Sequence, residues 1–342
     1  VCTGWNWTLE DLKAANREMN VAALYVTDDG ATRFYVTLDE DMLEPQVAFA
    51  QTDESRVKVD WGDGSEPEIG EEWGNYARVV LKHKYQEPGS YVIRFIPQGE
   101  CQIRFLGNNN SGAYIFTSSK SSALENVKYL SAVRKIELRN QVKDLDDYCF
   151  SYYSRLETIT LGQAVKTGNG IVKECWSLKF LGLPEGKTML SSYLCDGCEQ
   201  LTGISLPNGL TDLGDYAFDG CRSLKWVTLP DGVVTMGRYV FSDCSALEKM
   251  YIPDSLVKME TGIFKGCRMM EKFRIKNRIT EIVDSMFSGC YTLAEMIIHG
   301  AVTNVSRYAF ENCKGMQKYY FLPSNPPALG ATSAFMGISK DC

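Results

Sequence analysis

The stretch AFDGCRSLKWVTLP, residues 217–230, is one copy of a pattern that recurs every 23 residues and decides the fold. The copies that follow are VFSDCSALEKMYIP, IFKGCRMMEKFRIK, MFSGCYTLAEMIIH and AFENCKGMQKYYFLP. In most copies Phe stands three residues before the cysteine, and Leu or Met stands three residues after it. This spacing places the three side chains on one face of a short helical turn. The cysteines form a column: Cys175, Cys198, Cys221, Cys244, Cys267, Cys290 and Cys313.

A strand is predicted directly after each turn. Apolar residues two positions apart, such as Val227 and Leu229, are how a strand presents alternate side chains to a core. A proline such as Pro230 ends this strand in several repeats, and a further apolar pair such as Leu210 and Leu213 precedes the next turn. One repeat cannot bury its apolar face alone, whereas stacked repeats share a core, and such short periods are typical of leucine-rich repeats. We therefore predict a leucine-rich repeat solenoid, right-handed because sequential parallel strands coil that way.

The repeat pattern F-x-x-C-x-x-L-x-x-[IV]-x-L-P resembles the BspA-type leucine-rich repeats of bacterial surface proteins, over about residues 127–336. The stretch NPPALGATSAF, residues 325–335, resembles the terminal repeat of the same family. Members of that family are associated with extracellular attachment to host proteins or other cells. The resemblance implies a secreted or cell-surface bacterial binding protein, with an outer-membrane association as one form of it.

The cysteine column is predicted to be structural. Metal or redox chemistry needs cysteines that converge, with an open coordination position or a lowered pKa. This column instead supplies one cysteine per repeat, between two apolar residues, so we expect buried free thiols that act as small hydrophobic side chains. Cys195 and Cys198 form a CxxC, but Cys195 occupies the Phe position of its repeat. We predict no metal site and no cofactor.

The amino-terminal part carries strands of another kind. The runs RFYVTL, RVKVDWGDG, ARVVLKHKY, SYVIRF and CQIRF between residues 33 and 105 alternate in polarity and are separated by turn residues, which predicts an antiparallel sandwich. The motifs VDWGDGS at 59–65 and HKYQEPGSYVIRF at 83–95 resemble the PKD domain, an immunoglobulin-like extracellular module. That resemblance implies a spacer or support. Asp60 and Asp63 raise the alternative of a calcium site, but they offer few oxygens, so a structural turn is favoured.

The predicted organisation is multidomain. Residues 1–29 form an N-terminal segment with a short helix from Thr8, residues 30–106 an immunoglobulin-like, PKD-like β-sandwich, and residues 107–342 the solenoid. The stretch GNNNSG at 107–112 marks the boundary. Because the chain starts with Val1, we expect that a preceding segment was removed, and a secretory signal is one candidate for it. A lipid anchor on Cys2 is an alternative that Val1 disfavours.

Charge and composition exclude several functions. The net charge of −7 and the pI near 5.2 argue against a nucleic-acid partner. No apolar run is long enough for a transmembrane segment. The chain has two histidines, His83 and His299, one in each predicted part, so a nucleophile with a histidine base is not expected. We predict no catalytic residue and no enzyme.

Recognition is predicted on the outward side of the solenoid strands. Trp, Tyr and Arg side chains are frequent energetic anchors in interfaces, and neighbouring strands bring them together. We expect an extracellular protein ligand there, with a glycan stacked on the aromatic rings as the alternative. Scattered exposed aromatics without a ligand also remain an alternative, as does a purely structural role for the tyrosines at positions 148, 193, 216, 239 and 308. The candidate ligand-binding residues are Phe180, Trp226, Tyr251, Arg274, Ile297 and Tyr320.

Overall fold

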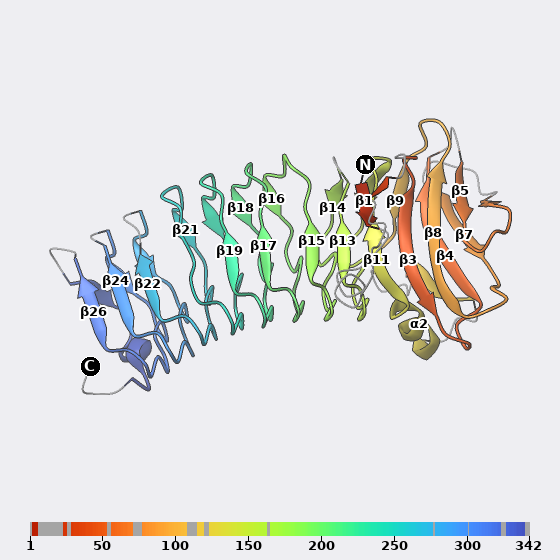
Figure 1. Ribbon diagram of the computed structural model, residues 1–342. Coiled ribbons are helices and arrows are strands. Elements are labelled where there is room, and N and C mark those ends of the chain that lie inside the picture. The colour runs from red at the N-terminus through yellow and green to blue at the C-terminus, as the bar shows by residue number, and fades with distance from the viewer. Residues whose placement is uncertain are drawn as a thin grey trace.

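The computed structural model is an elongated molecule in which strand-rich repeats run from an N-terminal part of mainly antiparallel strands to the C-terminal end (Figure 1). It describes residues 2–5, 23–25, 29–52, 56–70, 77–107, 115–119, 123–162, 165–275, 278–299, 301–322 and 326–338. The helix expected from Thr8, most of the stretch 107–112, the side chain of Cys2 and the end at Cys342 lie outside the described residues. Within 1–29, strands β1 (Cys2–Trp5) and β2 (Ala23–Tyr25) pair antiparallel.

Two antiparallel sets of strands make the N-terminal part. The first contains β3 (Thr32–Leu38), β8 (Gly89–Pro97), β5 (Val57–Asp60) and β6 (Glu68–Ile69), in that order. The second is built on β4 (Pro45–Gln51), which pairs with β7 (Ala77–Lys82), β9 (Ile103–Phe105) and β10 (Phe116–Ser118). The alternation in β3 buries Phe34, Val36 and Leu38. Strand β4 was not predicted, because Ala48 and Ala50 are also buried and erase the alternation.

Both sets of strands continue into the solenoid. Strand β3 pairs antiparallel with β11 (Val133–Glu137), and β9 pairs parallel with β12 (Val142–Leu145). The backbone ladders therefore cross the boundary expected near residue 107. An unpredicted helix, α2 (Ala123–Leu130), leads into β11 and buries Tyr129 and Leu130.

Most regular repeats contribute a strand to a first parallel layer, in which the hydrogen-bonded ladder is interrupted in two places. Its outward side is called the strand face below. The match between the repeat period and these strands confirms a solenoid of about 8 turns with repeats of about 23 residues. After β11 come β13 (Thr158–Thr160), β15 (Phe180–Gly182), β17 (Gly203–Ser205), β19 (Trp226–Thr228), β22 (Lys272–Ile275), β24 (Glu295–Ile298) and β26 (Lys318–Phe321).

A second, shorter strand in each repeat was not predicted as such. It carries the second residue of the further apolar pair, such as Leu213, which is buried in the core, whereas Leu210 precedes the strand. These strands form a second parallel layer: β12, β14 (Lys166–Thr167), β16 (Met189–Leu190), β18 (Asp212–Leu213), β20 (Thr235–Met236), β21 (Lys258–Met259), β23 (Glu281–Ile282), β25 (Asn304–Val305) and β27 (Ala328–Leu329).

The helical turn expected around each cysteine is instead a pair of tight turns. The amide of Cys221 donates to the carbonyl of Phe218 at 3.2 Å, and the amide of Leu224 donates to Cys221 at 3.0 Å. A second set of backbone bonds joins neighbouring repeats, for example from the amide of Phe218 to the carbonyl of Val240 at 2.9 Å. Backbone amides of these turns therefore donate to the next repeat, and a longer helix would need the same amides as donors. In the described residues, the C-terminal end of the repeats carries a 3-10 helix, η1 (Thr332–Phe335).

The core is continuous from the sandwich to the last repeat. Its centre is a stack of Phe rings, in which neighbours such as Phe218 and Phe241 lie 5.5 Å apart and nearly parallel. The stack ends where Phe335 packs on Phe310 at 5.3 Å. At the other end Phe150 contacts Phe34 of β3 at 5.9 Å. Burial of this apolar ladder is the main stabilising contribution that a repeat cannot obtain alone.

Candidate functional site

The six predicted binding residues occupy two rows of the strand face, on either side of the inward apolar residue. Phe180 and Trp226 belong to the first row, which continues at each later repeat in Lys249, Lys272, Glu295 and Lys318. Tyr251, Arg274, Ile297 and Tyr320 belong to the second row. The sequence analysis treated the six as a single ladder, and the strand register separates them because the two outward positions of each strand are two residues apart.

Most of these side chains are exposed. The exposed fractions are 54% for Phe180, 50% for Trp226, 58% for Tyr251 and 44% for Tyr320, while Arg274 is exposed and Ile297 is half-buried. Single exposed aromatic side chains are normal on a protein surface. The strand face differs in that its exposed aromatic and Arg residues recur at equivalent positions of several repeats.

The indole of Trp226 lies against Gly203 of the preceding repeat. Strand β17 lies between β15 and β19 in the repeat order, and Gly203 pairs in register with Trp226. A Cβ atom on Gly203 would lie 2.2 Å from Cε2 of the Trp226 indole. The indole thus lies across the backbone of the preceding repeat, which requires a residue without a side chain at that position.

The first layer is interrupted twice, between β15 and β17 and again after β19, and the second layer has a matching earlier break between β14 and β16. Residues 248–252 form no strand. In the described part of the chain, neither β19 nor β22 pairs with a strand on the side that faces these residues. The second layer also stops here, between β21 and β23. This interval between residues 248–252 and β22 is called the seam below. On the turn side the repeats stay joined, since the amide of Gly262 donates to Asp284 at 2.9 Å and the amide of Phe264 donates to Met286 at 3.0 Å.

A pocket of about 980 Å³ opens on the seam. Phe273 is buried at its base, and the exposed side chains of Tyr251, Met269 and Arg274 line it. The structure thus brings together three predicted residues, Tyr251, Arg274 and Ile297, while Phe180, Trp226 and Tyr320 lie outside the lining. Sequence reasoning expected a regular strand over residues 249–251 and missed the pocket. The lining residues are Glu248, Lys249, Met250, Tyr251, Ile252, Met269, Glu271, Lys272, Phe273, Arg274, Glu295 and Ile297.

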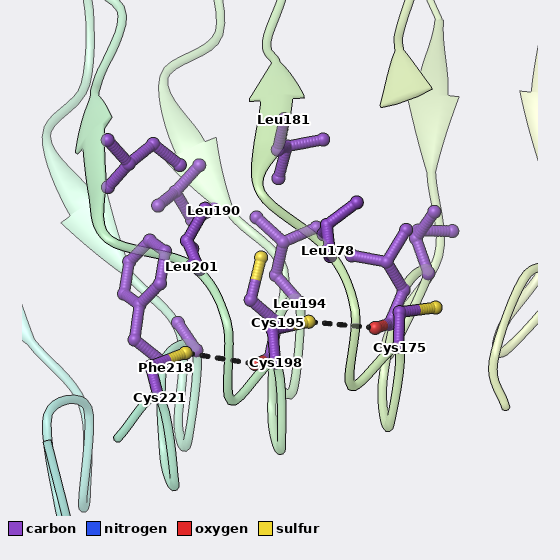
Figure 2. Close-up of a cluster of buried hydrophobic side chains, with 14 of the residues drawn as sticks. Cys175, Leu178, Leu181, Leu190, Leu194, Cys195, Cys198, Leu201, Phe218 and Cys221 are labelled. Carbon is purple, nitrogen blue, oxygen red and sulfur yellow. Dashed lines mark hydrogen bonds between the residues drawn. The ribbon is translucent and has the colours of Figure 1, made fainter. Parts of the chain in front are cut away.

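The column cysteines are buried and carry an additional bond that sequence reasoning missed. The thiol of Cys221 donates to the carbonyl oxygen of Cys195 at 3.2 Å, as Figure 2 shows for successive repeats. The same bond recurs along the column, 26 residues back in most repeats, for example from Cys290 to Phe264. Burial raises the pKa of the Cys221 and Cys290 thiols well above the ordinary value, so these groups stay protonated and are poor nucleophiles.

The tyrosine column is a stack along the edge of the second layer. Tyr193, Tyr216 and Tyr239 have left-handed backbone, and their rings stack at 5.0 Å and 5.1 Å. Gly262 takes the next place, where a Cβ atom would lie 2.2 Å from Cε1 of Tyr239. Because the rings pack on one another and on glycine, the structural interpretation accounts for their arrangement.

The Asp60 and Asp63 motif is a hydrogen-bonded turn. Asp63 accepts from the hydroxyl of Ser65 at 2.7 Å and lies 2.7 Å from Nε2 of His83, whose ring stacks on Trp61 at 4.8 Å. Burial raises the pKa of Asp63, but the hydrogen bonds from Ser65 and His83 outweigh it and lower this pKa to about 2. The oxygens of Asp63 are thus used by neighbouring side chains.

Metal-dependent and histidine-dependent chemistry has little support in the described residues. No group of three His, Cys, Asp or Glu side chains there is arranged to hold a metal ion. His83 follows β7 and His299 follows β24, and these strands lie at opposite ends of the molecule (Figure 1). None of the helices in the described ranges has the length and apolar character needed to cross a membrane.

Comparison with known proteins gives one family. Residues 105–202 and 188–317 match the BspA type leucine-rich repeat region, in six copies. No curated protein sequence matches the chain.

Three solved structures are similar. A leucine-rich repeat protein from Bacteroides ovatus is 22% identical over 56% of this chain and 61% of its own length, with a TM-score of 0.44. This chain thus spans less than two thirds of that protein. The T. pallidum leucine-rich repeat protein is 20% identical over 53% of this chain and 83% of its own, with a TM-score of 0.39. A leucine-rich cell surface protein from Faecalibacterium prausnitzii is 18% identical over 57% and 74%, with a TM-score of 0.34.

Proposed function

The chain belongs to the BspA type leucine-rich repeat family, and from this premise we propose that it is a binding protein that recognises a protein macromolecule through its strand face. We place it outside a bacterial cell or on the cell surface, in an adhesin-like role, as the family resemblance implies. One observation carries the proposal: Tyr251, Arg274 and Ile297 line a single pocket of about 980 Å³ on an exposed aromatic face. Such residues, grouped around a hollow, are the anchors that most often dominate binding free energy.

A glycan ligand is the second candidate, and a separate observation favours it. The exposed indole of Trp226 lies against Gly203, and Phe180 is exposed on the same row two repeats earlier. A flat aromatic surface suits the apolar face of a sugar ring, whereas a protein ligand would use the pocket at the seam as well. The two candidates therefore differ in which residues matter, Trp226 for a glycan and Tyr251 with Arg274 for a protein.

We further propose that residues 30–106 are a PKD-like, immunoglobulin-like module that supports the solenoid of residues 107–342. The hydroxyl of Tyr85 donates to the carbonyl of Trp61 at 2.8 Å, within the two motifs that carry the resemblance. Pairing of β3 with β11 and of β9 with β12 gives the first repeats a covered edge. A solenoid needs such a cover, because its terminal repeat otherwise exposes an apolar face and unpaired backbone groups.

The test is binding of the purified protein to immobilised matrix proteins, mucins and polysaccharides. The parent is compared with a variant in which Trp226, Tyr251 and Tyr320 are changed to Ala. A matched control changes Trp176, Tyr152 and Tyr291 to Ala, since these are similarly exposed but belong to the turns.

We expect the strand-face variant to lose at least tenfold in affinity while the turn variant binds as the parent does. Equal loss in both variants, or loss in the turn variant alone, would contradict a site on the strand face. Separate Trp226→Ala and Tyr251→Ala variants then decide between the glycan and the protein candidates.

A further inference from the structure

The seam coincides with an exact repetition of charge in two neighbouring repeats. Glu248 and Lys249 stand at the same repeat positions as Glu271 and Lys272. In a regular parallel ladder these residues would face each other across about 4.8 Å, and like charges directly opposite each other destabilise strand pairing. The next pair of repeats has the opposite arrangement, because Lys272 forms an ion pair with Glu295 at 3.0 Å across β22 and β24. Strands β22 and β24 thus pair where the charges alternate, whereas like charges would face each other at the seam. The earlier break between β15 and β17 has no such repetition, so the like charges are a feature of the seam and not of every break.

Three cations and three carboxylates line the seam pocket. Lys249 comes from one side of the seam and Lys272 and Arg274 from the other, and Glu295 pairs with Lys272 at 3.0 Å. Within the described residues, Lys249 and Arg274 form no ion pair. Glu248 and Glu271 directly precede the two lysines, whereas Arg274 stands three positions after Glu271 along an extended chain. A polyanion would meet these carboxylates, whereas a ligand with a single carboxylate can meet Arg274 away from Glu271.

Apolar surface adjoins the cations. Met269 is 50% exposed and Tyr251 is 58% exposed, and both line the pocket whose base is Phe273. An apolar side chain placed there would contact Met269, Tyr251 and Phe273 and would lose contact with water. A carboxylate on the neighbouring residue of the same ligand would then meet Arg274, which binds carboxylates through two parallel hydrogen bonds.

We propose that the seam pocket is the docking site for an extended peptide segment of a protein partner, in which a carboxylate side chain lies next to an apolar side chain. This inference rests on the proposed protein-binding function and names its ligand class. The carboxylate occupies the space between Lys249, Lys272 and Arg274, and the apolar side chain packs on Met269 and Tyr251. The bound negative charge offsets the repulsion between the two lysines, so docking also favours pairing of residues 248–252 with β22.

The experiment uses the full chain and a display library of random twelve-residue peptides. Selected peptides are expected to share Asp or Glu beside an aromatic or aliphatic residue. They should bind the parent at least tenfold more tightly than the Lys249→Glu/Arg274→Glu variant, and the Lys249→Met/Arg274→Met variant should fall between them. The control is Lys225→Glu/Arg222→Glu, two exposed cations of an earlier repeat that do not line the pocket. Circular dichroism of each variant confirms that it is folded.

A second measurement needs no peptide. Hydrogen exchange of the backbone amides at residues 248–252 is expected to be fast in the parent and slower when a selected peptide is bound. It is also expected to be slower in the charge-exchanged variant Glu248→Lys/Lys249→Glu, where opposite charges face Glu271 and Lys272. Unchanged exchange in that variant would overturn the charge explanation of the seam.

The binding experiments distinguish failure of the peptide site from failure of the proposed function. If a protein ligand from the panel binds and the Lys249→Glu/Arg274→Glu variant binds it equally well, the function stands and the seam is not its site. Selected peptides without a carboxylate, no selected peptide at all, or polysaccharide binding that needs Tyr251 but neither cation would each overturn the inference. Loss of panel binding in the turn variant alone would overturn both.

Discussion

The thiol of Cys244 donates a hydrogen bond to the carbonyl oxygen of Phe218, 3.2 Å away in the preceding repeat. That oxygen also accepts the amide of Cys221 within its own turn. The thiol therefore uses the second lone pair of a buried carbonyl and links two repeats through a small side chain in the core. This pairing explains why the column holds cysteine in place of alanine or valine, which lack a donor.

Replacing Cys244 by Ala is expected to lower the free energy of unfolding by about 1–3 kcal/mol, because a buried sulfur and its hydrogen bond are lost together. Urea denaturation followed by circular dichroism measures the change. Lys225→Ala, an exposed change nearby, should stay within about 0.5 kcal/mol of the parent. A similarly small effect of Cys244→Ala would show that the thiol adds nothing to the stack.

The column thiols are also expected to resist modification. Burial raises the pKa of Cys244 well above the ordinary value, and its side chain has no exposed surface. A thiol-specific reagent at pH 8 should leave Cys244 and its neighbours unmodified for as long as the protein stays folded, and should modify them in denaturant. Mass spectrometry of digested samples locates the label. Rapid labelling of a column cysteine in the folded protein would refute a structural role.

The solenoid could be predicted because its signal is repeated. Phe218, Cys221 and Leu224 recur in every later repeat with at most conservative changes, so each column averages over several copies. Strand β4 was missed for the opposite reason, since one segment that is apolar on both faces gives neither a strand period nor a helix period. The second strand of each repeat is only two residues long, as at Asp212–Leu213, and so short an element has no period of its own.

The site could be predicted only in part. Aromatic and Arg residues at outward positions were found, because alternation along a strand assigns each residue to a face. The seam depends on a relation between repeats, the recurrence of Glu248 and Lys249 at 271 and 272, and was missed because mixed charges along the strands are typical of a solvated rim. The thiol hydrogen bonds also join different repeats. In the sequence they correspond only to the constant spacing of the cysteines.

Asp219 should make stability depend on pH. Burial and the nearby charges of Asp196 and Asp243 raise the pKa of its carboxyl, and the hydrogen bond with Ser242 lowers it. The result is a pKa of about 6. One carboxyl oxygen is buried without a hydrogen-bond partner in the described structure. The folded state therefore favours the protonated acid. Its contribution to stability is fully present below the ordinary value of 3.8 and is lost as the pH rises through about 6.

Asp219→Asn removes this titration and keeps the shape of the side chain. We expect the variant to melt at a higher temperature than the parent at pH 7, and the difference to shrink as the pH falls from 6.5 to 4. Thermal melts across that range measure it, with Asp231→Asn, an exposed carboxylate, as the control for the loss of one charge. A difference that does not change with pH would mean that Asp219 is charged in the folded protein at all these pH values.

The contact between Phe34 and Phe150 tests whether the sandwich and the solenoid unfold together. Phe34 lies on β3, and its ring contacts Phe150 at 5.9 Å, Phe95 at 5.1 Å and Phe105 at 5.6 Å. Phe34→Ala should cost about 3–5 kcal/mol, the usual range for a buried Phe. The question is which part of the molecule loses that stability.

A double-mutant cycle with Phe150→Ala answers it, because coupled residues give a combined effect that differs from the sum of the single effects. We expect a coupling of about 0.5–1.5 kcal/mol between the rings and one unfolding transition, since strand pairs β3–β11 and β9–β12 bind the two parts together. Phe34→Leu should recover most of the loss by filling the space. Two separate transitions in Phe34→Ala, with the solenoid melting as in the parent, would instead mean that the first repeats are stable without their cover.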